Sequence, residues 1–143
     1  MKDFQKFVLL FVTVFLFLGA CKKEDNASTI TVEHISGTYK ILSIKTKMNA
    51  DPEQDVTSDL LRDCDRDNLY KLNTNFSCVT IDTGLVCNPP SNRTTTWALT
   101  GDTLIFLNQT LTIASFDGTT VKGTRTETNG TQTLLVTFII AKQ

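Results

Sequence analysis

The sequence predicts an all-β domain, either an antiparallel sandwich or an up-and-down barrel. Short stretches of alternating apolar and polar residues follow one another from residue 69 to 141, and turn residues separate them. Asn129-Gly130, the strongest two-residue hairpin signal in the chain, lies before the last stretch. Threonine, a β-branched residue suited to pleated and half-buried surfaces, occurs 23 times after residue 20. Many short strands joined by tight turns are typical of these two architectures.

The first strand is predicted over 36–47, where the alternation of apolar residues changes phase. Ile41 and Ser43 lie on one face of this strand, whereas Leu42 and Ile44 lie on the other. Both faces therefore compete for the interior. We expect a β-bulge or a bend near Ser43, because one extra residue would restore a single buried face.

Seven more strands are predicted after a short helix. The helix covers one or two turns within 57–63, with Thr57 or Ser58 as its N-cap. The later strands are separated by hairpin turns. They cover 69–72, 76–81, 94–99, 103–107, 110–116, 119–128 and 131–141.

Six aromatic residues are expected on the inward face of these strands. They are the candidates for lining a ligand pocket: Tyr39, Tyr70, Phe76, Trp97, Phe106 and Phe138. In the alternative interpretation they form a packed core, because an eight-stranded barrel is just wide enough to be filled by its own side chains. Four apolar residues fall on the opposite face and would form a patch that covers one end of the barrel or meets a partner. They are Ile105, Leu107, Leu135 and Ile139.

The N-terminus has the pattern of an export signal. Lys2 and Lys6 precede an apolar run over 7–18, and small residues then lead to Cys21. The twelve residues of this run, interrupted only by Thr13, reach only about 18 Å as a helix, well short of a bilayer core of about 30 Å. Leu18-Gly19-Ala20-Cys21 resembles the bacterial lipobox, which implies cleavage before Cys21 and acyl chains on that residue. The alternative is an ordinary cleaved signal followed by a chance cysteine.

These features predict three segments and a location. We expect a lipoprotein signal peptide over 1–20, a lipidated cysteine and flexible tether over 21–34, and one domain over 35–143. The protein would then be anchored by lipid in the bacterial cell envelope, at the outer membrane on its periplasmic or surface face. The formal net charge of −1 argues against a nucleic-acid partner, which would require a basic surface.

Several motifs together resemble the lipocalin-like domain of many small lipoproteins of the Bacteroidota. They are Gly37-Thr38-Tyr39-Lys40, the run from Cys64-Asp65-Arg66-Asp67-Asn68 to Leu69-Tyr70-Lys71-Leu72, Cys87, and Thr96-Trp97-Ala98-Leu99. The resemblance covers about residues 35–142. It implies a small eight-stranded antiparallel up-and-down barrel with one short helix near its entrance.

Three cysteines follow Cys21, and they allow three different single pairings. An exported protein is in a compartment that permits disulfides. The family resemblance implies a bond between Cys64 and Cys87. Cys78 would then be left over, and alternation places it inside as a small apolar residue. The competing pairing joins Cys78 to Cys87, which flank one turn-rich segment.

The sequence offers little that supports catalysis. His34 is the only histidine, and nothing else indicates a catalytic triad. Residues 63–68 resemble the start of a calcium loop, but Asn68 stands where glycine is required and Thr74 where glutamate is required. We expect a non-enzymatic lipoprotein, without cofactor or metal, that binds a small apolar ligand in the barrel. The alternative is a structural lipoprotein of the envelope with a solid core and a protein partner.

Overall fold

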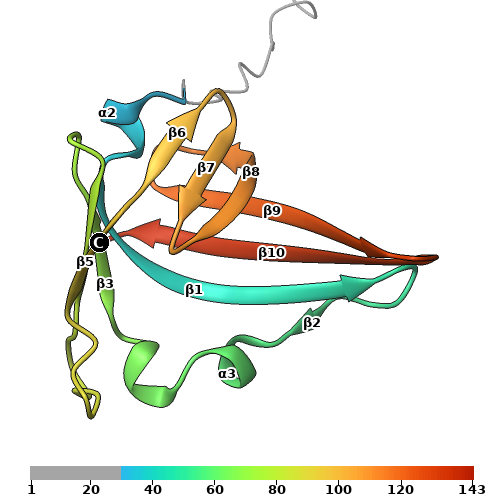
Figure 1. The fold of residues 1–143 in the computed structure, drawn as a ribbon, viewed down its shortest axis with the longest axis horizontal. Helices are drawn as coiled ribbons and strands as arrows, with labels where there is room; N and C mark the ends of the chain where they lie inside the picture. Colours follow the sequence, from blue (N-terminus) through green and yellow to red (C-terminus); the bar gives the residue numbers. More distant parts are fainter. Residues whose placement is uncertain (1–29) are drawn as a thin grey trace, which may run out of the picture.

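The computed structural model describes residues 30–143, which form a mostly β domain (Figure 1). Cys21, the expected signal peptide and most of the expected tether lie outside these residues. Helix α2 (Val32–Ile35) comes first, and the Thr31 hydroxyl caps it by accepting the N–H of His34. Ile35 is completely buried and belongs to the core cluster. No helix within 30–143 is long and apolar enough to span a membrane.

Within residues 30–143, ten strands form one antiparallel sheet that curls into a nearly closed barrel. Their order around the sheet is β5-β4-β3-β1-β10-β9-β8-β7-β6, and β2 pairs only with β1. The prediction of an antiparallel β-barrel is confirmed, whereas the count of eight strands is not. The strands are β1 (Gly37–Met48), β2 (Gln54–Asp55), β3 (Leu69–Leu72), β4 (Ser77–Ile81), β5 (Arg93–Thr96), β6 (Ala98–Thr100), β7 (Thr103–Phe106), β8 (Gln109–Phe116), β9 (Thr120–Asn129) and β10 (Gln132–Lys142).

Two local features explain the different strand count. Strand β2 is a two-residue addition at the edge of β1. The strand predicted over 94–99 is divided at Trp97, so that β5 pairs with β4 while β6 pairs with β7. These two strands are the two edges of the sheet, and the chain passes directly from one to the other. Trp97 therefore lies at the seam of the barrel, where its backbone N–H donates to the carbonyl of Phe76 at 2.9 Å.

Strand β1 contains the irregularity that its sequence predicts. Its register against β10 shifts between Ile41 and Ser43. Ile41 and Ile44 are both buried as a result, while the side chain of Leu42 is 53% exposed. The bulge thus turns the apolar residues on both sides of it toward one interior.

The short helix forms, but its cap differs from the prediction. Helix α3 (Thr57–Leu60) is followed by a 3-10 turn, η1 (Asp63–Asp65). The N-cap is Val56, which makes no side-chain capping bond. The Thr57 hydroxyl instead accepts the N–H of Ile44 at 2.7 Å and donates to Asp55 at 2.6 Å. This hydroxyl therefore fastens the start of α3 to β1.

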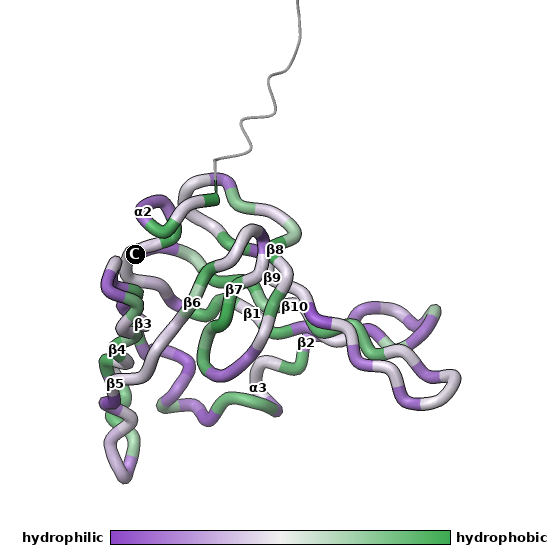
Figure 2. Tube along the Cα trace, turned by 45° about the horizontal axis from the view of Figure 1, so that its top comes forward, coloured by the Kyte–Doolittle hydropathy of each residue, from purple (hydrophilic) through white to green (hydrophobic). Residues whose placement is uncertain are grey.

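Large side chains fill the inside of the barrel, and Figure 2 shows apolar residues along the strands that enclose it. Tyr39 and Phe106 are completely buried, and the Tyr70 and Phe106 rings make a T-shaped contact with centroids 5.4 Å apart. Phe138 is partly buried against the same core. Residues 30–143 contain the whole sheet and one continuous core, which is what an independent folding unit requires.

Alternation predicts that Phe76 lies on the inward face of the barrel, and this prediction is wrong. Phe76 occupies the turn between β3 and β4 with a φ of 64°, so its side chain leaves the alternation of the strand. It is 42% exposed and its ring lies 5.5 Å from that of Trp97. Phe76 thus covers the seam of the barrel from outside.

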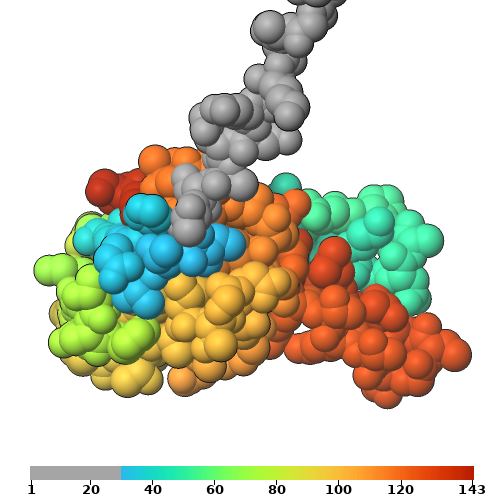
Figure 3. Space-filling model, turned by 90° about the horizontal axis from the view of Figure 1, so that it is seen from above, coloured from blue at the N-terminus to red at the C-terminus, as the bar shows by residue number. Residues whose placement is uncertain are grey.

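Helix α2 closes one end of the barrel. The Lys142 ammonium donates to the carbonyl of His34 at 2.5 Å and lies over the rings of Tyr39 and Phe116, 5.8 and 5.7 Å from their centroids. Figure 3 views this end and shows α2 on the surface beside β6 and β7. Helix α3 and η1 lie at the opposite end (Figure 1).

Replacing Tyr39 by phenylalanine should weaken the attachment of α2. The Tyr39 hydroxyl donates to the carbonyl of Ile35 at 2.7 Å, and burial raises the pKa of this hydroxyl well above its usual range. Tyr39→Phe leaves that buried carbonyl unpaired, so we expect the free energy of unfolding to fall by about 1–2 kcal/mol. Urea unfolding measures this loss, and an unchanged midpoint would contradict the role given to the bond.

Candidate functional site

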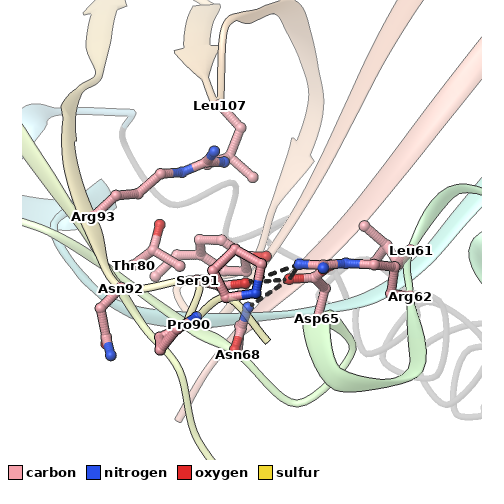
Figure 4. Close-up of a pocket in the computed structure, with 12 residues that line it drawn as sticks. Leu61, Arg62, Asp65, Asn68, Thr80, Pro90, Ser91, Asn92, Arg93 and Leu107 are labelled. Atoms are coloured by element: carbon pink, nitrogen blue, oxygen red, sulfur yellow. Dashed lines mark hydrogen bonds and ion pairs between the residues drawn. The ribbon is translucent and has the colours of Figure 1, made fainter. Parts of the chain in front are cut away.

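A pocket of about 350 Å³ opens at the end of the barrel that carries η1 (Figure 4). Its lining comes from three places: the chain around η1, the loop between β4 and β5, and the barrel strands with the turn after β7. We call it the mouth pocket. Its lining residues are Leu61, Arg62, Asp65, Asn68, Tyr70, Thr80, Pro89, Pro90, Ser91, Asn92, Arg93 and Leu107.

Three of these residues form a row across neighbouring strands. Tyr70 of β3 is paired with Thr80 of β4, which is paired in turn with Arg93 of β5. Directly paired residues of antiparallel strands project from the same face of a sheet. Tyr70 and Thr80 are buried, so this is the inner face of the barrel. In Figure 4 the Arg93 side chain extends across the pocket toward Leu107.

Two buried polar atoms of the pocket have no hydrogen-bond partner within residues 30–143. They are the Thr80 hydroxyl oxygen and the Asn68 side-chain oxygen, in residues that are 2% and 1% exposed. Buried polar groups are normally paired, and leaving one unpaired costs about 1–3 kcal/mol. A molecule in the pocket that hydrogen-bonds these atoms would recover that free energy.

A network centred on Asp65 builds one wall. Arg62 donates to both carboxylate oxygens of Asp65, at 2.6 and 3.2 Å. Ser91 and Asn68 donate to the same carboxylate at 2.7 and 3.2 Å. The hydrogen bond from Arg62 lowers the pKa of Asp65 despite its partial burial. The network is therefore complete above the pKa of an unfolded aspartate, near 4, and is lost as pH falls through the lower pKa of the folded state.

Arg93 supplies positive charge close enough to Asp65 to add, after the hydrogen bond and charge of Arg62, to the lowering of the pKa of that carboxyl. Its guanidinium makes no hydrogen bond or ion pair with any other residue of 30–143, whereas Arg62 is paired with Asp65. Burial raises the pKa of the Cys78 thiol, and the charge of Arg93 opposes part of that rise. The mouth pocket thus contains two arginines: Arg62, which is paired with Asp65, and Arg93, whose guanidinium can still bind an anionic group.

The loop between β4 and β5 forms the second wall and is fixed at several points. Asp82 accepts the N–H groups of Cys87 and Ser91 at 3.1 and 2.7 Å. Cys87 forms a disulfide with Cys64, with the sulfur atoms 2.08 Å apart. This is the pairing that the family resemblance implies, and Cys78 is free and buried. The disulfide joins η1 to this loop, so it connects two walls of the pocket.

Leu107 contributes an apolar edge from a strained turn. Leu107 and Asn108 have φ of 51° and 60° and form the two-residue connection between β7 and β8. The turn thus lies one residue earlier than the 108–109 turn that the sequence predicts. A left-handed backbone is unfavourable for leucine, and such residues often occur at functional sites. The turn moves Leu107 off the outer face and into the pocket lining.

The structure brings one of the six aromatic candidates to the pocket. Tyr70 lines it, whereas Tyr39, Trp97 and Phe106 are buried in the barrel core. The sequence patterns did not identify the polar residues of the pocket as lining candidates. Thr80 continues the inward alternation after Cys78, which was a usable signal. Residues 89–92 belong to an irregular loop, and no local pattern predicts that they approach η1.

Within residues 30–143, one group of cysteines and acidic residues near η1 has the spacing of metal ligands. Ligand atoms of Cys64, Asp65 and Cys87 lie within 4.8 Å of one another. The two sulfurs are bonded to each other, however, and a disulfide provides no thiolate ligand. Asp65 is paired with Arg62, and Asp63 with Arg66. Two of the three carboxylates of the calcium-loop motif are therefore engaged by arginines, and the third, Asp67, accepts the N–H of Leu85 at 2.7 Å.

Comparison with known proteins identifies no relative: no family model, no curated protein and no solved structure matches this chain.

Proposed function

We propose that this protein is a membrane-anchored, non-enzymatic lipoprotein of the lipocalin-like type that binds a small amphiphilic molecule at the mouth of its barrel. One observation carries this proposal: an open pocket of about 350 Å³ contains buried polar atoms without partners. Small-molecule sites have volumes of roughly 300–1,000 Å³ and combine apolar walls with a few placed polar groups.

The filled core favours the mouth over the barrel interior as the binding site. Tyr39, Trp97 and Phe106 occupy the interior and are at most 2% exposed. The pocket lies between this core and the solvent at the η1 end of the barrel, and Leu61, Leu107 and the Tyr70 ring give it apolar surfaces. The ligand therefore differs from the wholly apolar one that the sequence suggests, since it would meet both apolar and charged surfaces.

The position of α2 supports exchange of the ligand with the aqueous phase. Helix α2 and η1 lie at opposite ends of the barrel (Figure 1). Lipid on Cys21 would connect to the domain at the α2 end, through the residues that precede Thr31. The mouth pocket would then open at the end of the domain that is remote from this attachment.

The proposed anchor has a direct test. Cys21→Ala removes the sulfur that would carry the lipid, so we expect the protein to lose metabolic labelling by fatty acid and to leave the membrane fraction. The matched control is Cys78→Ala, which removes a different thiol and should leave both properties unchanged. Fatty-acid labelling of the Cys21→Ala protein would show that the lipid is attached elsewhere.

A protein partner is the second candidate function, favoured by one exposed apolar site. Leu85 and Val86 are 60% and 61% exposed at the tip of the loop between β4 and β5. The patch expected around Ile105 is smaller than predicted, because Leu135 and Ile139 are half-buried. The loop tip would replace that patch as the contact surface.

Filling the mouth pocket tests ligand binding with a neighbouring residue as control. Leu61 lines the pocket, whereas Leu60 is 59% exposed and does not. We expect residues 22–143 to bind the neutral fluorescent probe N-phenylnaphthylamine. Leu61→Trp should weaken this binding at least about tenfold by occupying the pocket, and Leu60→Trp should not. Equal affinities in both variants would contradict binding at the mouth.

A further inference from the structure

We propose that the mouth pocket selects ligands with an anionic group on an apolar body, and that Arg93 together with Thr80 recognises this group. This inference rests on the function proposed above and adds the chemical class of the ligand. It begins from two donor groups of the pocket that have no hydrogen-bond partner within residues 30–143: the guanidinium of Arg93 and the hydroxyl of Thr80. The third unpartnered group, the Asn68 side-chain oxygen, can only accept a hydrogen bond.

Arg93 lies on the inward-facing side of β5, beside the buried Thr80, yet at the open end of the barrel. Arginine is almost never fully buried without a partner, and this position leaves its guanidinium free of one while solvent still reaches it. Here the acidic residue of the pocket, Asp65, already accepts two hydrogen bonds from Arg62. Arg93 is exposed at the mouth, so a ligand can reach its guanidinium. A guanidinium presents paired N–H donors that match the oxygens of a carboxylate, sulfonate or phosphate.

Thr80 provides a second donor beside this charge. Thr80 and Arg93 are directly paired across β4 and β5, so their side chains leave the sheet side by side. The Thr80 hydroxyl is buried and without a partner, and a hydroxyl can rotate to donate to a nearby oxygen. One anionic group placed over this pair would satisfy both residues at once.

The remaining lining determines what the anionic group is attached to. Tyr70 continues the row from Thr80 on the next strand, and Leu61 and Leu107 approach from the end of α3 and from the β7–β8 turn. These side chains give the pocket an apolar part next to its charged part. Arg62 cannot serve as an equal second cation, because Asp65 neutralises it. The geometry therefore fits an amphiphile with a single anionic group.

Two probes with the same rings separate this inference from the proposed function. N-phenylnaphthylamine is neutral, and anilinonaphthalene sulfonate adds a sulfonate to the same skeleton. We expect residues 22–143 to bind the sulfonate at least about tenfold more tightly. Arg93→Gln and Thr80→Val should each weaken sulfonate binding by a clearly larger factor than binding of the neutral probe, while Arg93→Lys should restore part of the sulfonate affinity. Arg66→Gln is the control, since Arg66 is paired with Asp63 outside the pocket.

The outcomes are distinct. If both probes bind equally and Arg93→Gln affects neither, the function stands and the anion selectivity is wrong. If neither probe binds the unaltered protein, the proposed function fails and this inference fails with it. Competition identifies the required chemistry: decanoate should displace the sulfonate probe, and inorganic phosphate at the same concentration should not. Displacement by phosphate alone would overturn the requirement for an apolar body.

Discussion

Trp97→Ala is expected to cause the largest loss of stability of any single substitution in the domain, about 3–5 kcal/mol in the free energy of unfolding. Trp97 is 2% exposed and is the largest fully buried side chain within residues 30–143. Its indole N–H also donates to the carbonyl of Asn73 at 2.8 Å. The substitution therefore creates a cavity and leaves a carbonyl without its donor.

Trp97→Ala should also weaken the closure of the barrel, in addition to removing one core side chain. Trp97 connects β5 to β6, the two edges of the sheet, so its packing holds the barrel closed. Trp97→Phe is the matched control, since it keeps a ring but removes the N–H, and we expect it to cost clearly less than Trp97→Ala. Urea unfolding followed by circular dichroism measures both. A loss below about 1 kcal/mol for Trp97→Ala would contradict the closing role.

Removing the disulfide by the double substitution Cys64→Ser and Cys87→Ser should lower the free energy of unfolding by about 3 kcal/mol. The bond closes a loop with a sequence separation of 23, and its loss enlarges the conformational freedom of the unfolded chain. It also releases the loop between β4 and β5 from η1. We therefore expect weaker binding of both naphthylamine probes to the double variant.

Cys78→Ala is the control for this experiment because Cys78 is buried but unbonded. It should cost less stability than the double variant and should leave probe binding unchanged. Peptide mapping without reduction should recover Cys64 linked to Cys87. A double variant with unaltered stability and unaltered probe affinity would contradict the role of the bond in the pocket walls.

Local sequence patterns predict much of this fold because the strands have one apolar and one polar face. The change of phase around Leu42 correctly predicts a bulge in β1, since only an extra residue allows both Ile41 and Ile44 to be buried. The same reasoning fails at Phe76. Alternation assumes an extended backbone, but Phe76 lies in a turn with positive φ and faces outward.

The candidate site is less predictable because distant segments build it. Tyr70 and Thr80 follow the inward alternation of their strands, so their placement is implicit in the sequence. The approach of Ser91 to Asp65, by contrast, depends on a loop held by Asp82 and by the disulfide. Irregular loops have no periodicity that indicates which side chains they bring together.

Native mass spectrometry of residues 22–143, produced in their own host and purified gently, tests the central claim most directly. We expect a small acidic molecule to accompany the protein, to be lost on denaturation, and to be absent from the Leu61→Trp variant. A protein that carries no such mass and takes up neither naphthylamine probe would contradict the claim that the mouth pocket binds a ligand. That result would favour a solid barrel that acts through the exposed loop tip at Leu85 and Val86.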